Sequence, residues 1–384
     1  MGKRKICVVV ASRANYGRIK SVLFAIERHP KLELQLIVEA SAVLYNYGNV
    51  ASIIEKDGLK ISATSYSIVA GENLVTMAKS TGLALMELSV LFGELQPDIV
   101  VTVADRFETL ATAIAASYLN ITLAHTQGGE LTGSIDESVR HAITKLAHIH
   151  FPANEEAVSV LRQLGENPDR IFNTGCPAID VVVEALKKDP GNLFQKYGGT
   201  GNILNWDEPY LVVLQHPNTN EYDQSEGIVL KTLEAVHKAG VNVVVLWPNA
   251  DAGSAEFSKE MRMFRARAKD ARFHFYRNLP PEDYVHLINN CACLVGNSSS
   301  GIREGAFLGV PVVNIGTRQN CRQRGANVVD VEYDTEKIYS AVMTQLEHGK
   351  YVSYPIYGTG TAGEKIADIL SKCELSVEKR FFHV

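Results

Sequence analysis

The stretch Cys293-Leu294-Val295-Gly296-Asn297-Ser298-Ser299-Ser300-Gly301-Ile302-Arg303-Glu304 runs from an apolar segment through a polar turn into an amphipathic segment. Residues 291–295 predict a buried β-strand, and residues 302–308 predict a helix. The turn between them is rich in glycine and serine, so it exposes amides and hydroxyls that suit a phosphate. It contains neither Gly-Lys-[Ser/Thr] nor Gly-x-Gly-x-x-Gly, which argues against ATP hydrolysis and against NAD.

The same order of strand, polar turn and helix recurs along the chain and predicts an α/β protein with parallel sheets. We expect strands at residues 6–11, 32–38, 99–103, 121–124, 149–152, 211–214, 241–246, 273–276, 291–295 and 310–315. We expect helices at residues 16–28, 73–95, 107–119, 135–146, 224–239, 254–268, 282–289 and 302–308. The rhythm pauses near Gly175-Cys176-Pro177, and residues 189–207 have the composition of a surface connection. The sequence therefore predicts two consecutive doubly wound domains, residues 1–175 and 176–360.

The composition is that of a globular protein large enough for two domains: 384 residues, 46% hydrophobic and 21% charged. A net charge of -5 gives no basic surface for nucleic acid. No stretch approaches the ~20 apolar residues of a membrane span, and the apolar run near the N-terminus is too short for a signal peptide. The six cysteines include no Cys-x-x-Cys pair. Cys291 and Cys293 lie two apart in an apolar run, so we expect them to be small core residues in a reducing, cytoplasmic setting.

Doubly wound sheets bind ligands at the carboxyl ends of their strands, so polar residues just after strands are the functional candidates. Asp105 and Arg106 follow an almost entirely apolar strand, which predicts a central, partly buried position. A structural ion pair and a functional pair fit this pattern equally well. Arg13 follows the first strand, and from that segment alone an ordinary turn with a solvated arginine is the favoured interpretation.

The connection after the strand at 121–124 is dense in polar groups around Gly128-Gly129: His125, Gln127, Glu130, Asp136, Arg140 and His141. Ser134 and Glu137 match a capping box, so we expect Glu137 to cap a helix. Asp136 and Arg140 are spaced i, i+4, which a simple helical ion pair explains. The density of titratable groups beside a double glycine instead favours a functional loop.

Three histidines of the first half, His141, His148 and His150, raise the question of a metal site. His148 and His150 lie two apart on a strand-like run, and no carboxylate or thiol completes a zinc or facial-triad spacing. We therefore expect structural histidines and no bound metal.

Together these segments resemble the UDP-N-acetylglucosamine 2-epimerases, particularly the hydrolysing branch that feeds sialic acid synthesis. The similarity covers about residues 5–320, and the matching segments follow one another in the order of the family. The segments taken together in this order are far more specific than any single segment. The matching segments are Ser12-Arg13-Ala14-Asn15-Tyr16, Asp105-Arg106, Gly128-Gly129-Glu130, Asp136…Arg140-His141-Ala142-Ile143-Thr144-Lys145, Gln215-His216-Pro217, Pro248-Asn249-Ala250-Asp251-Ala252-Gly253-Ser254, Gly296-Asn297-Ser298-Ser299 and Gly316-Thr317-Arg318-Gln319.

The resemblance implies a GT-B-like fold, with two Rossmann-type domains around a cleft and residues 361–384 packed back on the first. It implies a homodimer or homotetramer that needs no metal or redox cofactor. Ser298 and Ser299 would contact phosphate and Glu304 the ribose, while Arg13, Arg106 and His216 would stabilise the departing diphosphate. The full set implied for UDP is Arg13, Gly17, Arg106, His216, Asn249, Ser298, Ser299, Gly301, Glu304 and Arg318.

The implied reaction is loss of UDP from C1 with removal of the C2 proton, giving a glycal. Water then adds with inversion at C2 and releases N-acetylmannosamine. A carboxylate base in a dry cleft suits this step, because the C2 proton becomes acidic only as the C1–oxygen bond breaks. The implied catalytic set is Asp105, Glu130, Asp136, Gln127, His216 and Arg140, with Asp105 and Asp136 the first candidates for the base.

The loop departs from the family at Gln127, where many relatives carry a glutamate two residues after the histidine. Glutamine cannot transfer a proton, although it can orient water or an N-acetyl group. The departure keeps a second substrate open, UDP-2,4-diacetamido-2,4,6-trideoxyglucose (UDP-N,N'-diacetylbacillosamine), a precursor of legionaminic acid. The motifs also leave open a non-hydrolysing epimerase, a glycosyltransferase and a non-catalytic nucleotide-sugar sensor.

Overall fold

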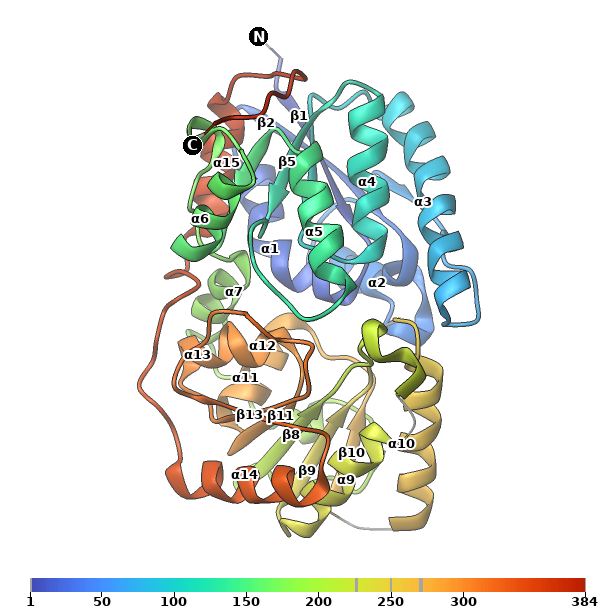
Figure 1. Cartoon of the computed structure of the whole chain (residues 1–384), viewed down its shortest axis with the longest axis vertical. Coiled ribbons are helices and arrows are strands. Elements are labelled where there is room, and N and C mark those ends of the chain that lie inside the picture. Colours follow the sequence, from blue (N-terminus) through green and yellow to red (C-terminus); the bar gives the residue numbers. More distant parts are fainter. Residues whose placement is uncertain (1, 225–226, 249–250, 269–271, 384) are drawn as a thin grey trace.

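The computed structural model describes residues 2–224, 227–248, 251–268 and 272–383. These residues form two α/β units, each built on a sheet of mainly parallel strands, that are stacked along the long axis of the molecule (Figure 1). The N-terminal sheet has the strand order β3-β2-β1-β4-β5-β6 and is parallel throughout. Its strands are β1 Arg4–Val10, β2 Leu32–Val38, β3 Ala63–Thr64, β4 Ile99–Val103, β5 Thr122–Thr126 and β6 Ile149–Phe151. Its helices are α1 Arg13–Arg28, α2 Val50–Lys56, α3 Leu74–Leu95, α4 Phe107–Tyr118, α5 Ile135–Leu146 and α6 Glu155–Gln163.

The C-terminal sheet has the order β13-β12-β11-β8-β9-β10-β7, and only its edge strand β7 runs antiparallel to its neighbour. The strands are β7 Thr200–Gly201, β8 Tyr210–Leu214, β9 Asn242–Leu246, β10 Phe273–Tyr276, β11 Cys293–Gly296, β12 Val312–Ile315 and β13 Val328–Val331. The helices after α6 are α7 Pro177–Ala185, α8 Leu193–Lys196, α9 Ile228–Lys238, α10 Ser254–Ala268, α11 Pro281–Asn290, α12 Ser299–Ile302, α13 Glu304–Leu308, α14 Thr335–His348 and α15 Ala362–Lys372. The expected pair of doubly wound sheets is confirmed.

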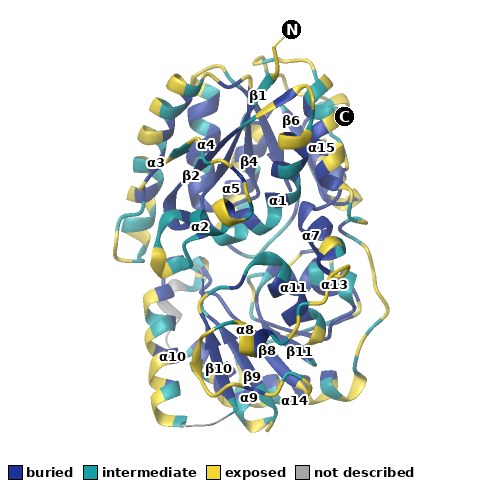
Figure 2. Cartoon of the chain, turned by 180° about the vertical axis from the view of Figure 1, so that it is seen from behind, coloured by how far each residue is buried: buried dark blue, intermediate teal, exposed yellow. Residues whose placement is uncertain are grey.

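Each sheet is buried between helices, as the dark strands of Figure 2 show. In the N-terminal unit, apolar residues of β1 and β4 pack against α1, and Ile366 and Leu370 of α15 join the same core. The last helix thus lies on the N-terminal unit although it follows the C-terminal one. Cys291 and Cys293 are buried, which confirms the expected core positions, whereas Cys321 is exposed and Cys373 half-buried.

By length and composition alone, α3 contradicts the prediction that no segment approaches a membrane span. This helix has 22 residues, and 17% of its long apolar stretch is buried. The helix packs on α4 at the outer side of the N-terminal sheet (Figure 1). Val75, Met86 and Val90 are largely exposed on it, so its apolar character comes partly from its outer face.

The predicted helix at 302–308 is divided in the structure. Residues Ser299–Ile302 and Glu304–Leu308 form two short helices joined at Arg303, whose ψ of -70° departs from the regular helix. The predicted helix at 224–239 begins at Ile228, and residues 225–226 lie outside the described part of the chain. These differences matter because the α12–α13 segment borders the space between the two units.

Candidate active site

A cavity lies between the two units, where the carboxyl ends of both sheets face each other. From the N-terminal unit it is lined by α1 and by residues that follow β4 and β5, and from the C-terminal unit by residues that follow β8, β11 and β12. The lining includes most of the site residues expected from the sequence: Arg13, Gly17, Asp105, Arg106, Asp136, His216, Ser298, Ser299, Glu304 and Arg318.

Four expected residues do not line this cavity: Gln127, Glu130, Arg140 and Gly301. A Cβ atom on Gly301 would lie 2.9 Å from Cγ1 of Val312, so this glycine permits close packing on the sheet. Its expected role as a nucleotide contact stays a prediction. A fifth expected residue, Asn249, lies outside the described residues.

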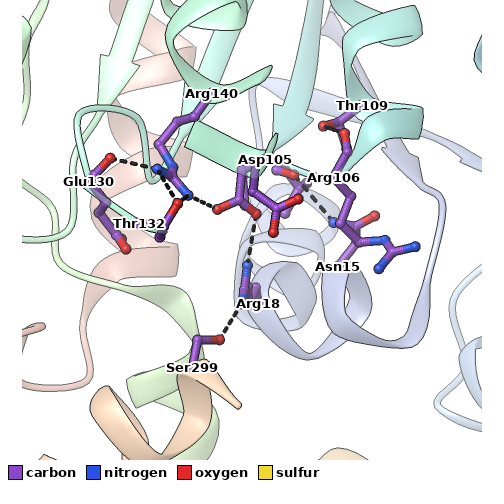
Figure 3. A network of polar contacts seen from close by, with 12 residues as sticks. Asn15, Arg18, Asp105, Arg106, Thr109, Glu130, Thr132, Arg140 and Ser299 are labelled. Carbon is purple, nitrogen blue, oxygen red and sulfur yellow. Dashed lines mark hydrogen bonds and ion pairs between the residues drawn. The ribbon is translucent and has the colours of Figure 1, made fainter. Parts of the chain in front are cut away.

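Asp105 is held by arginines from three directions. Arg140 donates to Oδ2 of Asp105, and Nη1 of Arg18 lies 3.5 Å from Oδ1 (Figure 3). Burial opposes ionisation of Asp105, but Arg140, Arg18 and Arg322 outweigh it and hold the pKa of this carboxyl well below its usual range. Asp105 is therefore a fixed negative charge beside the cavity.

Arg140 pairs with Asp105 rather than with Asp136, the partner that its helical spacing would allow. It is fully buried, and it also donates to the backbone oxygen of Glu130 at 2.6 Å. Asp136 points elsewhere, with Oδ2 3.5 Å from Nη2 of Arg318 across the cavity. The simple helical ion pair that this spacing would explain is not formed, because each of the two side chains has a partner outside α5.

Asp136 has the opposite electrostatic environment from Asp105. It lies in the first turn of α5, and its ion pair with Arg318 is long, at 3.5 Å. Burial and the negative charge of Asp105 raise the pKa of Asp136 above its ordinary value. A carboxyl with a raised pKa at a cavity wall can both accept and return a proton.

Glu130 lies behind the cavity wall and forms ion pairs across the two units. Its Oε2 is 2.5 Å from Nη2 of Arg303 and 3.3 Å from Nη1 of Arg322. Although burial opposes it, Arg303, Arg322 and Arg140 lower the pKa of Glu130. We therefore do not retain Glu130 as the proton-transfer group, because it is ionised and removed from the ligand space.

The serine turn after β11 projects hydroxyls into the cavity. Ser298 caps α12 by accepting from the amide of Ser300, and Ser299 accepts from Nη2 of Arg18 at 2.5 Å. The hydroxyl of Tyr284 lies 2.5 Å from that of Ser300. Hydroxyls and an arginine at one wall can bind phosphate oxygens.

Sequence reasoning missed Arg18, Tyr284 and Arg322, which all line the cavity. Arg18 lies in the same helix as Arg13, so only an assignment of the faces of α1 would have indicated it. Arg322 follows Arg318 by four residues in an irregular loop, where no periodicity orients a side chain.

The three groups expected at the departing diphosphate are positioned by the protein itself. Arg13 donates to the backbone oxygens of Arg277 at 2.8 Å and Trp247 at 3.1 Å. Burial, followed by the charges of Arg318 and Arg13, holds the pKa of His216 well below its usual range, so this imidazole is neutral. A neutral imidazole can donate one hydrogen bond to a phosphate oxygen.

Arg106 connects the two units at the cavity wall. It makes two hydrogen bonds to Glu108, of 2.9 and 3.1 Å, and its Nη1 lies 2.7 Å from Oδ1 of Asp251. These pairs fix its orientation at the cavity wall.

The comparisons with known proteins agree with this geometry. The family model for UDP-N-acetylglucosamine 2-epimerase matches residues 24–371. The chain belongs to this family. It is 31% identical over 385 residues to the UDP-N-acetylglucosamine 2-epimerase of Neisseria meningitidis, covering 99% of this chain and 98% of the relative. It is 32% identical to the UDP-N,N'-diacetylbacillosamine 2-epimerase (hydrolyzing) of Legionella pneumophila, covering 97% of each.

Solved structures confirm the GT-B-like fold of this UDP-sugar 2-epimerase. The Methanocaldococcus jannaschii enzyme in complex with UDP-GlcNAc and UDP superposes with a TM-score of 0.78 at 19% identity, covering 96% of this chain and 99% of that one. The UDP-GlcNAc-bound Neisseria meningitidis enzyme gives a TM-score of 0.78 at 17% identity, covering 95% and 99%. At this identity the likeness supports the fold alone.

Gln127, the departure of this epimerase from many relatives, is fully buried and has a left-handed φ of +61°. Neither polar atom of its side chain has a hydrogen-bond partner among the described residues. Gln127 does not line the cavity. At residue 127 the loop therefore contributes no carboxylate to the cavity wall.

The helix-capping prediction in this loop is partly wrong. Ser134 caps α5 as expected, but its hydroxyl accepts from the amide of Asp136 at 3.3 Å. Glu137 accepts from the amide of Thr132 instead of the capping residue. Glu137 therefore fixes the loop that carries Thr132 into the cavity wall.

The histidines of this unit have protein partners. Nε2 of His150 lies 2.9 Å from Oε2 of Glu166, and Nδ1 of His148 accepts from the amide of Leu123 at 3.0 Å. Within the described ranges, no three His, Cys, Asp or Glu side chains lie close enough to hold a metal ion.

Proposed function

We propose that the chain is a hydrolysing epimerase that converts UDP-N-acetylglucosamine and water into N-acetylmannosamine and UDP, for the synthesis of sialic-type sugars. The relatives that share about a third of its sequence include epimerases named as hydrolysing, whereas UDP-N-acetylglucosamine 2-epimerases of Salmonella typhimurium and Methanocaldococcus jannaschii share 24% and 22%. The cavity between the units supports the proposal, because it offers cations and hydroxyls for a diphosphate beside two carboxylates for a sugar.

The observation that carries the proposal is the separation of the pKa values of Asp105 and Asp136. The first is held ionised by arginines, and the pKa of the second is raised by burial and by the first. Two carboxyl groups in one site with divergent pKa values divide electrostatic and proton-transfer roles between them.

In the proposed elimination, Asp136 removes the C2 proton and the C1–oxygen bond breaks on the opposite face. The bonding electrons leave with UDP, and the C1–C2 double bond of a glycal remains. Asp105 stabilises the positive charge that develops on the ring, while Arg13, Arg106 and His216 bind the departing diphosphate.

In the proposed hydration, the oxygen of water forms the bond to C1 and a proton is delivered to C2 from the face opposite to the one it left. Gln127 cannot supply this proton. A water molecule in the cavity is the donor that we propose for this step. It recovers its proton from the water that adds to C1, and Asp136 returns to solvent the proton that it took from C2.

UDP-N,N'-diacetylbacillosamine is the second candidate substrate. The Legionella pneumophila relative with that name matches 97% of the chain at 32% identity, close to the value for the Neisseria meningitidis relative. The two sugars differ at C4 and C6, away from the proposed reaction at C1 and C2, so the same carboxylates serve either.

The test is incubation with each UDP-sugar in D₂O, followed by NMR. We expect free 2-epimeric sugar with deuterium at C2 together with UDP. An equilibrium between two UDP-sugars would identify a non-hydrolysing epimerase. UDP release that requires an acceptor would indicate a glycosyltransferase, and no UDP release from either substrate would leave only a sensor.

A further inference from the structure

A network of buried ion pairs continues from Asp105 into the C-terminal unit. Asp105 contacts Arg18, Arg140 and Arg322, at 3.5 Å for Arg18 and 3.9 Å for Arg322. Glu130 contacts Arg322 at 3.3 Å and Arg303 at 2.5 Å. Four guanidinium groups therefore share two carboxylates, which leaves a formal excess of two positive charges.

Arg322 is the member of this network with the most unused hydrogen-bonding capacity. It is 4% exposed, and neither its Nε nor its Nη1 has a hydrogen-bond partner among the described residues. Its contacts with Glu130 and Asp105 are ion pairs at 3.3 and 3.9 Å. Burial lowers the pKa of Arg322, and the like charge of Arg303 lowers it further. A buried guanidinium with free donors requires an anion or another acceptor.

Arg322 lines the cavity, so its acceptor can come from a ligand. On the same wall Arg18 joins Asp105 to Ser299, and these three residues also line the cavity. A phosphate near Asp105 would be repelled unless cations compensated its charge. Arg18 and Arg322 lie on either side of that carboxylate, and the excess of two charges matches the two negative charges of a diphosphate diester.

We propose that Arg322 binds the β-phosphate of the nucleotide sugar, the phosphate that carries the sugar. This inference rests on the proposed function. The β-phosphate is bonded to C1 and therefore lies nearest the carboxylates that act on the sugar. Arg322 lies 3.9 Å from Asp105, one of those carboxylates, whereas Glu304, the group expected at the ribose, lies beyond the serine turn at the start of α13.

Arg322 then binds the β-phosphate more strongly in the transition state than in the ground state. When the C1–oxygen bond breaks, the β-phosphate gains one negative charge. A guanidinium already fixed by Asp105 and Glu130 meets that charge without reorganisation. The variant Arg322→Gln is therefore expected to lower kcat as well as affinity.

The test compares UDP, UMP and uridine as ligands of the full-length protein by calorimetry. For Arg322→Gln we expect the affinity for UDP to fall about 10- to 100-fold, the loss typical of a charge-assisted hydrogen bond, while UMP and uridine change less than about two-fold. Arg322→Lys keeps the charge and should recover part of the loss. Arg28→Gln, which removes an exposed arginine on the far end of α1, is the matched control.

Each other outcome would overturn the assignment. An equal loss for UMP would place Arg322 at the α-phosphate. An unchanged affinity for UDP with a raised KM for the UDP-sugar would place it at the sugar. If Arg322→Gln melts at a lower temperature, the comparison is made with Arg322→Lys, in which a β-phosphate contact predicts a loss for UDP alone. Wild-type protein that binds none of the three ligands would refute the proposed function itself.

Discussion

Asp105 and Asp136 line one cavity, and their interaction can be measured through pH. The negative charge of Asp105 contributes to the raised pKa of Asp136, after burial. Removing that charge in Asp105→Asn should lower the pKa of Asp136, so the acid limb of kcat/KM should move to lower pH in the residual activity. Asp136→Asn should lower kcat by about 10²–10⁴-fold, the usual contribution of a general base.

The measurement is a pH–rate profile for UDP release. Glu156→Gln is a suitable control, because this exposed glutamate lies in the first turn of the neighbouring helix α6. Glu156→Gln should leave both the acid limb of kcat/KM and the value of kcat unchanged. An acid limb that stays in place in Asp105→Asn would show that Asp136 is not the titrating group.

The sequence indicated these two carboxylates but not their partners. Parallel strands end at one edge of a sheet, so the residues that follow them gather at that edge. The many titratable groups of the loop at 125–141 indicate the same region. The spacing of Asp136 and Arg140 suggested a local pair, and the structure separates them. Burial brings Arg140 to Asp105, 35 residues away along the chain, and no local pattern encodes such a contact.

At the scale of elements, the C-terminal tail fixes the end of α5 opposite to Asp136. Nζ of Lys379 donates to the backbone oxygen of Thr144 at 2.7 Å and lies 2.5 Å from Oε2 of Glu166. Glu166 also contacts Lys145 and His150, at 2.8 and 2.9 Å. Burial opposes ionisation, but His150 and Lys379 outweigh it and lower the pKa of Glu166 to about 2.

This cluster predicts a pH dependence of stability. The folded-state pKa of Glu166 is below its ordinary value, so its stabilisation is present above about pH 4.5 and is lost as the pH falls toward 2. Glu166→Gln should cost about 1–3 kcal/mol near neutral pH, because it leaves the half-buried Lys379 without its carboxylate. Its free energy of unfolding should fall less steeply in acid than that of the wild type. Urea unfolding at several pH values measures both, and parallel acid slopes would contradict the assignment.

The longer elements were predictable and the short ones were not. The strands at 32–38, 99–103 and 273–276 and the helices at 135–146 and 254–268 begin and end as predicted, because an apolar run or a strong 3.6-residue period defines them. β3 and β7 have two residues each and lie at sheet edges, where no core face imposes a pattern. The break at Arg303 follows from its buried pair with Glu130, a tertiary contact.

At the scale of the whole molecule, the two units are joined by ion pairs on both sides of the cavity. Lys20 of α1 is 5% exposed, and its Nζ lies 2.7 Å from Asp57 of the N-terminal unit and 2.6 Å from Glu282 of α11. Arg106 and Asp251 make the corresponding pair elsewhere along the boundary. Lys20 does not line the cavity, so it can affect the ligand only through the arrangement of the units.

Lys20→Met should therefore shift the free protein toward a more open arrangement. It leaves Asp57 and Glu282 facing each other as like charges, which favours separation of the units. A ligand that needs both walls then binds only the closed fraction, so KM for the UDP-sugar should rise about 3- to 10-fold while kcat at saturation is retained. Small-angle X-ray scattering should give a larger radius of gyration without ligand and the wild-type value with saturating UDP. Lys60→Met, at an exposed lysine of the same unit, is the control, and if Lys20→Met matches it in both measurements the ion pair does not govern closure.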